Sequence, residues 1–276
     1  MELKGNGTQI QMAEFDRRYA QVGATTQTGV AVDEGLRSYM LTVYNYMCAG
    51  LVLTGLVAYF LFTQAVTSDP NLAAQGARGA LAIKRGMFLT PLGATLYTTW
   101  FKWVIMLAPL AFVFFLSFRV YSMSVGAAQL TFWLFAAVMG ASMSVIFLVF
   151  TATSIAQVFS ITAATFACLS LYGYTTKKDL SGWGTFLIMG VIGLIIASLV
   201  NIFLQSPALQ FAISCIGVLV FAGLTAYDTQ QIKDSYYQYV GDATMAAKGA
   251  IMGALNLYLD FINMFQSLLS LLGDRD

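Results

Sequence analysis

GAIMGALNLYLDFINMFQSLLSLLG, residues 249–273, is the last apolar stretch of the chain and carries an acidic residue, Asp260, near its middle. It is long enough for a helix that crosses a bilayer, which takes about 20 residues. A carboxylate near the bilayer centre costs roughly 2.5–3.5 kcal/mol on insertion scales, so it must face protein or water. The stretch therefore predicts a membrane helix that is surrounded by other helices.

Small and polar residues share one face of this predicted helix. At about 100° per residue they fall within a narrow stripe, while leucine and phenylalanine cover much of the rest. The stripe consists of Gly249, Gly253, Asn256, Asp260, Asn263 and Ser267. We interpret Asn256, Asn263 and Ser267 as candidates for lining an aqueous path, and the two glycines as positions of close helix packing. The stripe favours a conduit across the membrane.

The composition places the whole chain in the membrane class. Of its 276 residues, 58% are apolar and only 10% are charged, against about 25% charged in soluble domains. This predicts an all-α, polytopic helical bundle. A net charge of +1 gives no indication of nucleic-acid binding. The chain contains no histidine, which excludes histidine-based catalysis and histidine zinc sites. We expect no catalytic residues and no prosthetic cofactor.

Apolar runs of spanning length predict seven transmembrane helices. They lie near residues 38–63, 103–122, 126–151, 155–174, 184–204, 208–228 and 250–272. The polar residues 1–37 predict a cytoplasmic tail with at most a short helix, ahead of a membrane domain over 38–276. Residues 64–102 predict a long, ordered or interfacial loop that rests on the membrane surface. Lys and Arg gather in the even-numbered connections and before the first span, which predicts a cytoplasmic N-terminus.

A second acidic residue, Asp228, ends the sixth span. Of the thirteen acidic residues, only Asp228 and Asp260 lie within predicted spans, on helices adjacent in sequence. If they face each other, burial and mutual repulsion keep at least one proton on the pair, which then titrates as a unit. We expect the higher of the pair's two titration steps to lie near physiological pH. A doubly ionised pair would be a hard oxygen site that suits transient binding of Ca²⁺.

Arg119 lies at the inner end of the second predicted span, in the segment LSFRVYSMS. It can be a positively charged flank of the kind that sets orientation. It can also be a latch that closes the inner mouth through an ion pair with Asp228. Both interpretations are open at this point.

Several ordered blocks of the chain resemble the Bax inhibitor-1 family, on its bacterial YccA-like branch. The blocks are the segment from FSITAATFACL to NIFLQS over residues 159–206, TAYDTQQIK at the end of the sixth span, ALNLYLDFINMFQSLL in the last span and LAPLAFVFFLSFR in the second. The resemblance covers residues 38–272. It implies seven helices with the last one central, and a pH-sensitive calcium leak through the bacterial inner membrane. It also implies that Asp228 and Asp260 match the family's paired aspartates and Arg119 its latch arginine.

Three other functions are weighed against the channel. An intramembrane aspartyl protease would also use two aspartates, but Asp260 lies in LYLDF and not in a GxGD motif, and Pro207-Ala208-Leu209 precedes both aspartates. A non-conducting regulator of a membrane-bound AAA protease would use the N-terminal tail for docking. A proton-coupled calcium antiporter would exchange the two ions stoichiometrically, although no inverted repeat supports it.

Overall fold

The computed structural model describes residues 6–76, 79–84 and 86–275, with the side chains of 6–33, 79, 80 and 84 left undescribed. Seven of its helices have the length and apolarity to cross a membrane. The helices are α1 (Asn6–Ala65), α3 (Phe101–Arg119), α4 (Val125–Met143), α6 (Ala152–Thr175), α7 (Ser181–Leu204), α8 (Pro207–Tyr239) and α9 (Ala243–Leu272). The protein is therefore an all-α polytopic membrane bundle, as the composition predicts.

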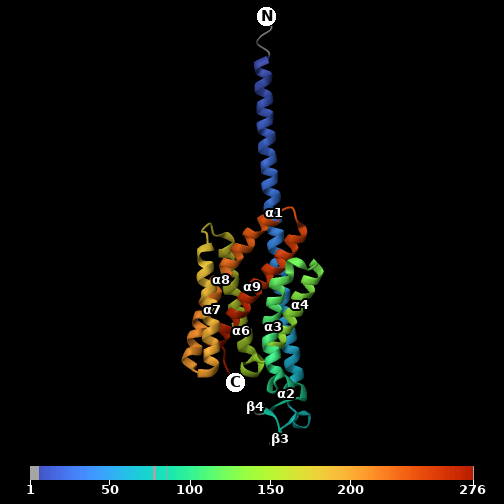
Figure 1. Ribbon diagram of the computed structural model, residues 1–276, viewed down its shortest axis with the longest axis vertical. Coiled ribbons are helices and arrows are strands. Elements are labelled where there is room, and N and C mark those ends of the chain that lie inside the picture. Colours follow the sequence, from blue (N-terminus) through green and yellow to red (C-terminus); the bar gives the residue numbers. More distant parts are fainter. Residues whose placement is uncertain (1–5, 77–78, 85, 276) are drawn as a thin grey trace.

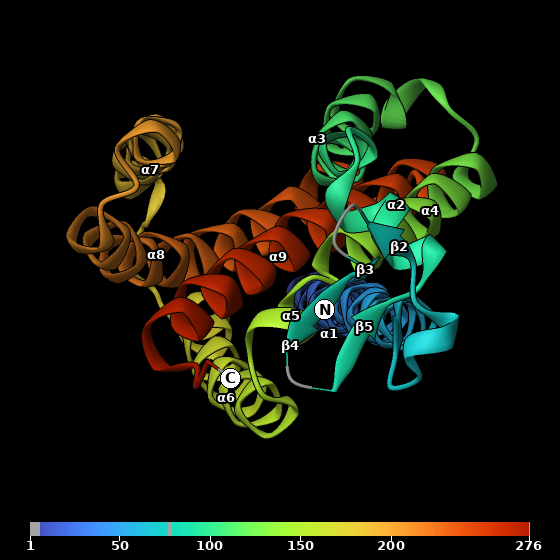
Figure 2. The same cartoon turned by 90° about the horizontal axis from the view of Figure 1, so that it is seen from below.

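Helix α9 lies at the centre of the bundle (Figure 2). It packs against α1, α4, α6 and α8, and α8 is its most extensive neighbour. The side chains of Leu257, Tyr258 and Met264 are fully enclosed. A helix that is apolar nearly all round and carries one polar stripe has no stable place at the lipid surface, so it takes the interior. The central position of the last helix is confirmed.

Polar side chains begin several of the spanning helices. Each accepts a hydrogen bond from a backbone N–H of the first turn and so satisfies a group that the helix cannot. These caps are Ser124 for α4, Thr151 for α6, Ser206 for α8 and Asp242 for α9. The short segment α5 (Ile146–Val149) and the turn η2 (Val120–Ser122) complete the connections.

The two ends of the bundle differ. We call the end at which the α1 span begins, at Glu34, the N-side, and the opposite end the far side. Helix α9 begins at the N-side and runs unbroken for 30 residues, about 45 Å at 1.5 Å per residue. Figure 1 shows the C-terminus at the end opposite to the N-terminus. The last segment thus runs from one end of the bundle to the other and does not fold back.

The long loop is an ordered far-side cap. Its strands are β1 (Val66–Thr67), β2 (Gln75–Gly76), β3 (Gly79–Ala80), β4 (Ala82–Lys84) and β5 (Met87–Leu89), joined by the turn η1 (Pro70–Leu72) and followed by helix α2 (Pro91–Thr98). Strands β1, β5 and β4 form an antiparallel sheet in that order. The positive φ of Gly86, 75°, permits the tight turn between β4 and β5.

The N-terminal segment differs from its prediction. Instead of a tail with at most a short helix, α1 extends from Asn6 as one helix of 60 residues that projects beyond the bundle (Figure 1). Adding residues to an existing helix avoids the cost of nucleation. The α1 span provides such a nucleus, and the preceding sequence contains neither proline nor a strong stop signal. Propagation from the membrane span therefore explains the long helix.

Candidate functional site

The polar stripe of α9 faces α8. A methyl group built on Gly253 would lie 3.1 Å from the Ile232 side chain, and one built on Gly217 would lie 2.6 Å from the Ser267 hydroxyl. Gly249 makes the equivalent approach to the ring of Tyr239. The small residues therefore let two antiparallel helices approach closely along their length.

Asp228 and Asp260 meet within this interface. Asp260 is 4% exposed and Asp228 is half-buried. The two carboxyl groups lie within hydrogen-bonding reach of each other. Among the described residues, Oδ2 of Asp260 is buried and receives no hydrogen bond from an N–H or hydroxyl group. Two carboxyl groups can join only through a proton on one of them, so the geometry fits a pair that shares a proton.

The other residues of the stripe divide between the interface and its edge. Asn256 is exposed, whereas Asn263 and Ser267 are partly buried. The Asn263 amide donates to the Leu259 carbonyl at 2.8 Å, and the Ser267 hydroxyl donates to the Asn263 carbonyl at 2.8 Å. In the described part of the chain these side chains bond within α9 and not to Asp260. Their place as pore lining stays a prediction.

Arg119 is not brought to the carboxyl pair. It ends α3 at the N-side with an exposed side chain. The buried Lys248 of α9 donates to the Tyr121 carbonyl at 2.9 Å. The end of α3, where Arg119 lies, is therefore at the depth of the first turns of α9. About 18 Å of helix separates Lys248 from Asp260 at 1.5 Å per residue. The predicted contact between Arg119 and Asp228 is therefore not formed among the described residues, because the two lie at different depths.

A hydrogen-bonded chain that the sequence analysis missed supports the α8 side of the pair. The Tyr44 hydroxyl of α1 bonds to the Ser170 hydroxyl of α6 at 2.7 Å, which bonds to the Thr229 hydroxyl of α8 at 3.0 Å. Thr229 adjoins Asp228. The available signal was a polar residue in the N-side half of each of three spanning helices, because such residues need partners inside the membrane.

The next residue of α8 ties the helix to a loop. The Gln230 side chain donates to the Lys178 carbonyl at 2.8 Å and accepts from the Leu180 N–H at 2.8 Å. Both partners lie in the connection between α6 and α7. This bidentate contact sets the depth of α8, and hence of Asp228, relative to that connection.

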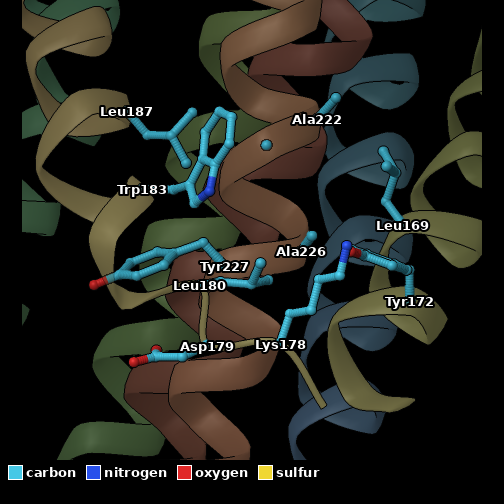
Figure 3. A pocket seen from close by; sticks show the side chains of 11 residues that line it. Leu169, Tyr172, Lys178, Asp179, Leu180, Trp183, Leu187, Ala222, Ala226 and Tyr227 are labelled. Atoms are coloured by element: carbon cyan, nitrogen blue, oxygen red, sulfur yellow. The ribbon is translucent and has the colours of Figure 1, made fainter. Parts of the chain in front are cut away.

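A cavity of about 410 Å³ lies between α6, α7 and α8 (Figure 3). Its lining includes Tyr172, Lys178, Trp183 and Tyr227. Tyr227 packs over Gly184 of α7, whereas the next residue, Asp228, faces α9. The rotation of about 100° between successive residues separates the two sides of α8. The cavity is therefore distinct from the carboxyl pair.

The pair has few oxygen ligands to offer a metal ion. Among the described residues, no cluster of three or more His, Cys, Asp or Glu side chains is present. Ca²⁺ takes six to eight oxygen ligands. Two carboxyl groups would thus leave most ligand positions of such an ion to water.

Comparison with known proteins identifies the family. The model of the family described as inhibitor of apoptosis-promoting Bax1 matches residues 36–276. A protein of Caulobacter vibrioides is 43% identical over 262 residues, which cover 95% of this chain and 98% of the relative. A protein of Rickettsia prowazekii is 43% identical over 259 residues, which cover 93% and 98%.

The inner membrane protein YbhL of Escherichia coli K12 is 43% identical over 242 residues, which cover 87% of this chain and 93% of the relative. The match to the family model and these identities extend over nearly the whole membrane domain. The YccA-like branch within the family stays a prediction. The chain belongs to the Bax inhibitor-1 family.

Proposed function

We propose that this protein is a pH-sensitive calcium leak pathway of the bacterial inner membrane, with its N-terminus in the cytoplasm. The observation that carries the proposal is the contact between the Asp228 and Asp260 carboxyl groups inside the closely packed α8–α9 interface. Membership of the Bax inhibitor-1 family and likeness to an inner membrane protein support the location.

The protonation state of the pair would control whether α8 and α9 stay in contact. With one proton shared, the two carboxyl groups hold α8 against α9. When that proton leaves, two negative charges in a low-dielectric site repel each other, and the helices separate. The ionised oxygens then attract a hydrated divalent cation. In this proposal protons and Ca²⁺ are the partners, and neither a catalytic residue nor a prosthetic cofactor is required.

The test is calcium flux in proteoliposomes of the purified protein. In Asp260→Asn the pair cannot become doubly charged. We therefore expect flux to stay near the low value that the wild type has while its pair shares a proton, and to lose its dependence on pH between about pH 6 and 8. A pH profile that matches the wild type would remove Asp260 from the mechanism.

Asp179→Asn is the matched control. Hydrogen bonds from the Ser181 hydroxyl and backbone N–H hold the pKa of Asp179 below its ordinary value. A carboxylate with a lowered pKa stays ionised as the pH falls from 8 to about 6 and gains its proton only in stronger acid. Its removal should leave the pH profile of calcium flux unchanged.

Calcium flux that saturates and exchanges with protons in a constant ratio would indicate an antiporter in place of a channel.

Regulation of a membrane-bound AAA protease is a second candidate function. The helical extension of α1 beyond the bundle favours it, because a projecting helix is a surface on which a partner can dock (Figure 1). Such a role can coexist with ion flux, and deletion of the extension separates the two.

A further inference from the structure

We propose that the crevice between α1 and α6 binds an anionic phospholipid, with an acyl chain in the crevice and the phosphate at Arg37. Both helices pack against α9 but make few contacts with each other in the described chain. The space left between them is a cavity of about 850 Å³. Pockets that bury whole small ligands have volumes of about 300–1,000 Å³.

The walls of this lipid crevice are apolar. Met40, Met47 and Leu51 of α1 face Ala163 and Ala167 of α6 across it. Met side chains adapt to irregular ligands, and alanines leave room for an acyl chain. Both helices are membrane spans, so the medium beside the crevice is hydrocarbon. Lipid chains are the material that can fill an apolar space that opens to hydrocarbon, because the bilayer core holds water only in cavities that protein lines.

The mouth of the crevice is cationic. Arg37 lines it and is exposed, one turn inside the N-side end of the α1 span. Tyr174 also lines the mouth, and the Lys233 ammonium group lies 5.4 Å from the centre of its ring. The acidic Glu34 lies on the preceding turn of α1. The same ammonium group donates to the Tyr174 carbonyl at 2.9 Å, so Arg37 is the cation that lines the mouth. A cation at the depth of the headgroups attracts a phosphate and discriminates against lipids without net negative charge.

The crevice also borders the carboxyl pair. Phe261, which adjoins Asp260, contributes to its lining. Ser170 lines it as well and bonds to Thr229, which adjoins Asp228. A bound chain would thus contact the neighbour of Asp260 directly, and on the Asp228 side it would contact Ser170, which bonds to the neighbour of Asp228. The binding itself does not depend on the proposed ion flux.

The first test compares lipids on the purified full chain in detergent. Native mass spectrometry would count dioleoyl phosphatidylglycerol and dioleoyl phosphatidylcholine that stay bound when both are added equally. We expect the wild type to retain phosphatidylglycerol preferentially. Arg37→Gln should weaken that retention about fivefold, the effect of one cation near a headgroup. Lys177→Gln, which removes an exposed N-side cation outside the crevice, should behave as the wild type.

The second test fills the crevice. Ala167→Phe places a ring in the cavity, whereas Ala164→Phe, at another exposed alanine of α6, places it outside. Both variants are expected to fold, which their thermal unfolding would verify. Ala167→Phe should lose retention of both lipids and Ala164→Phe should keep it. Equal retention of lipid by Ala167→Phe and Ala164→Phe would overturn the proposal. So would a preference for phosphatidylglycerol that is the same in Arg37→Gln as in the wild type.

Discussion

Tyr258 and Asp260 show how α9 holds two kinds of polar group inside the bundle. The Tyr258 ring is fully buried, with its centre 5.2 Å from that of Phe135 in an edge-on contact. Its hydroxyl bonds to the Thr54 hydroxyl at 2.7 Å, and that hydroxyl donates to the Ala136 carbonyl at 2.9 Å. Among the described residues, the group within hydrogen-bonding reach of the Asp260 side chain is the carboxyl group of Asp228. The tyrosine is therefore a structural anchor, while the aspartate is the group whose state can change.

We expect Tyr258→Phe to destabilise the protein by about 0.6 kcal/mol and at most by about 1.7 kcal/mol, the mean and the maximum measured for hydrogen bonds between membrane helices. The change removes the donor to Thr54 and keeps the ring in place. Unfolding in mixed detergent would measure the loss. Tyr172→Phe, at a tyrosine that is 49% exposed on α6, is the control and should change stability little. An equal effect of the two changes would mean that the buried hydroxyl contributes nothing.

Helix packing depends on where each small residue lies. On α4, a methyl group built on Gly140 would lie 2.6 Å from the Thr54 carbonyl oxygen of α1, whereas one built on Gly126 would meet no atom within 4 Å. A backbone atom cannot move aside as a flexible side chain can. The two glycines of one helix therefore have opposite consequences for substitution.

Gly140→Ala should lower the free energy of unfolding by about 1–3 kcal/mol, since it overpacks the contact between α1 and α4. Gly126→Ala should leave it unchanged or raise it by up to about 1 kcal/mol, because alanine restricts the unfolded chain. Thermal unfolding of the two variants beside the wild type measures both. A Gly140→Ala protein as stable as the wild type would show that α1 and α4 can move apart at no cost.

The whole molecule consists of a membrane bundle and a helical extension of α1 that projects beyond it. Leu36 is the first residue of α1 that contributes to the described core. Seven helices of spanning length place the start of α1 and the end of α9 at opposite ends of the bundle (Figure 1). A partner at the helical extension would therefore act on the side where Arg37, Lys248 and the N-side ends of the helices lie.

Deletion of residues 2–33 should leave calcium flux and its pH profile as in the wild type, since the core contacts of the described side chains all lie after the deletion. Any regulation of a membrane-bound AAA protease should be lost. Proteoliposome flux and turnover of a protease substrate in cells measure the two effects. Loss of flux together with retained regulation would contradict both expectations and place the extension in the ion pathway.

The sequence by itself determined the class of the protein, the seven spans and the central place of α9, because a buried carboxylate and long apolar runs have few solutions in a bilayer. It also singled out Asp228 and Asp260 as the acidic residues within the predicted spans. Only the tertiary structure decided that α8 brings them together and that Arg119 lies at another depth. Depth along a helix depends on how neighbouring helices slide against each other, and contacts such as those of Gln230 and Lys248 set it. Those contacts join residues far apart in the chain, so no local pattern predicts them.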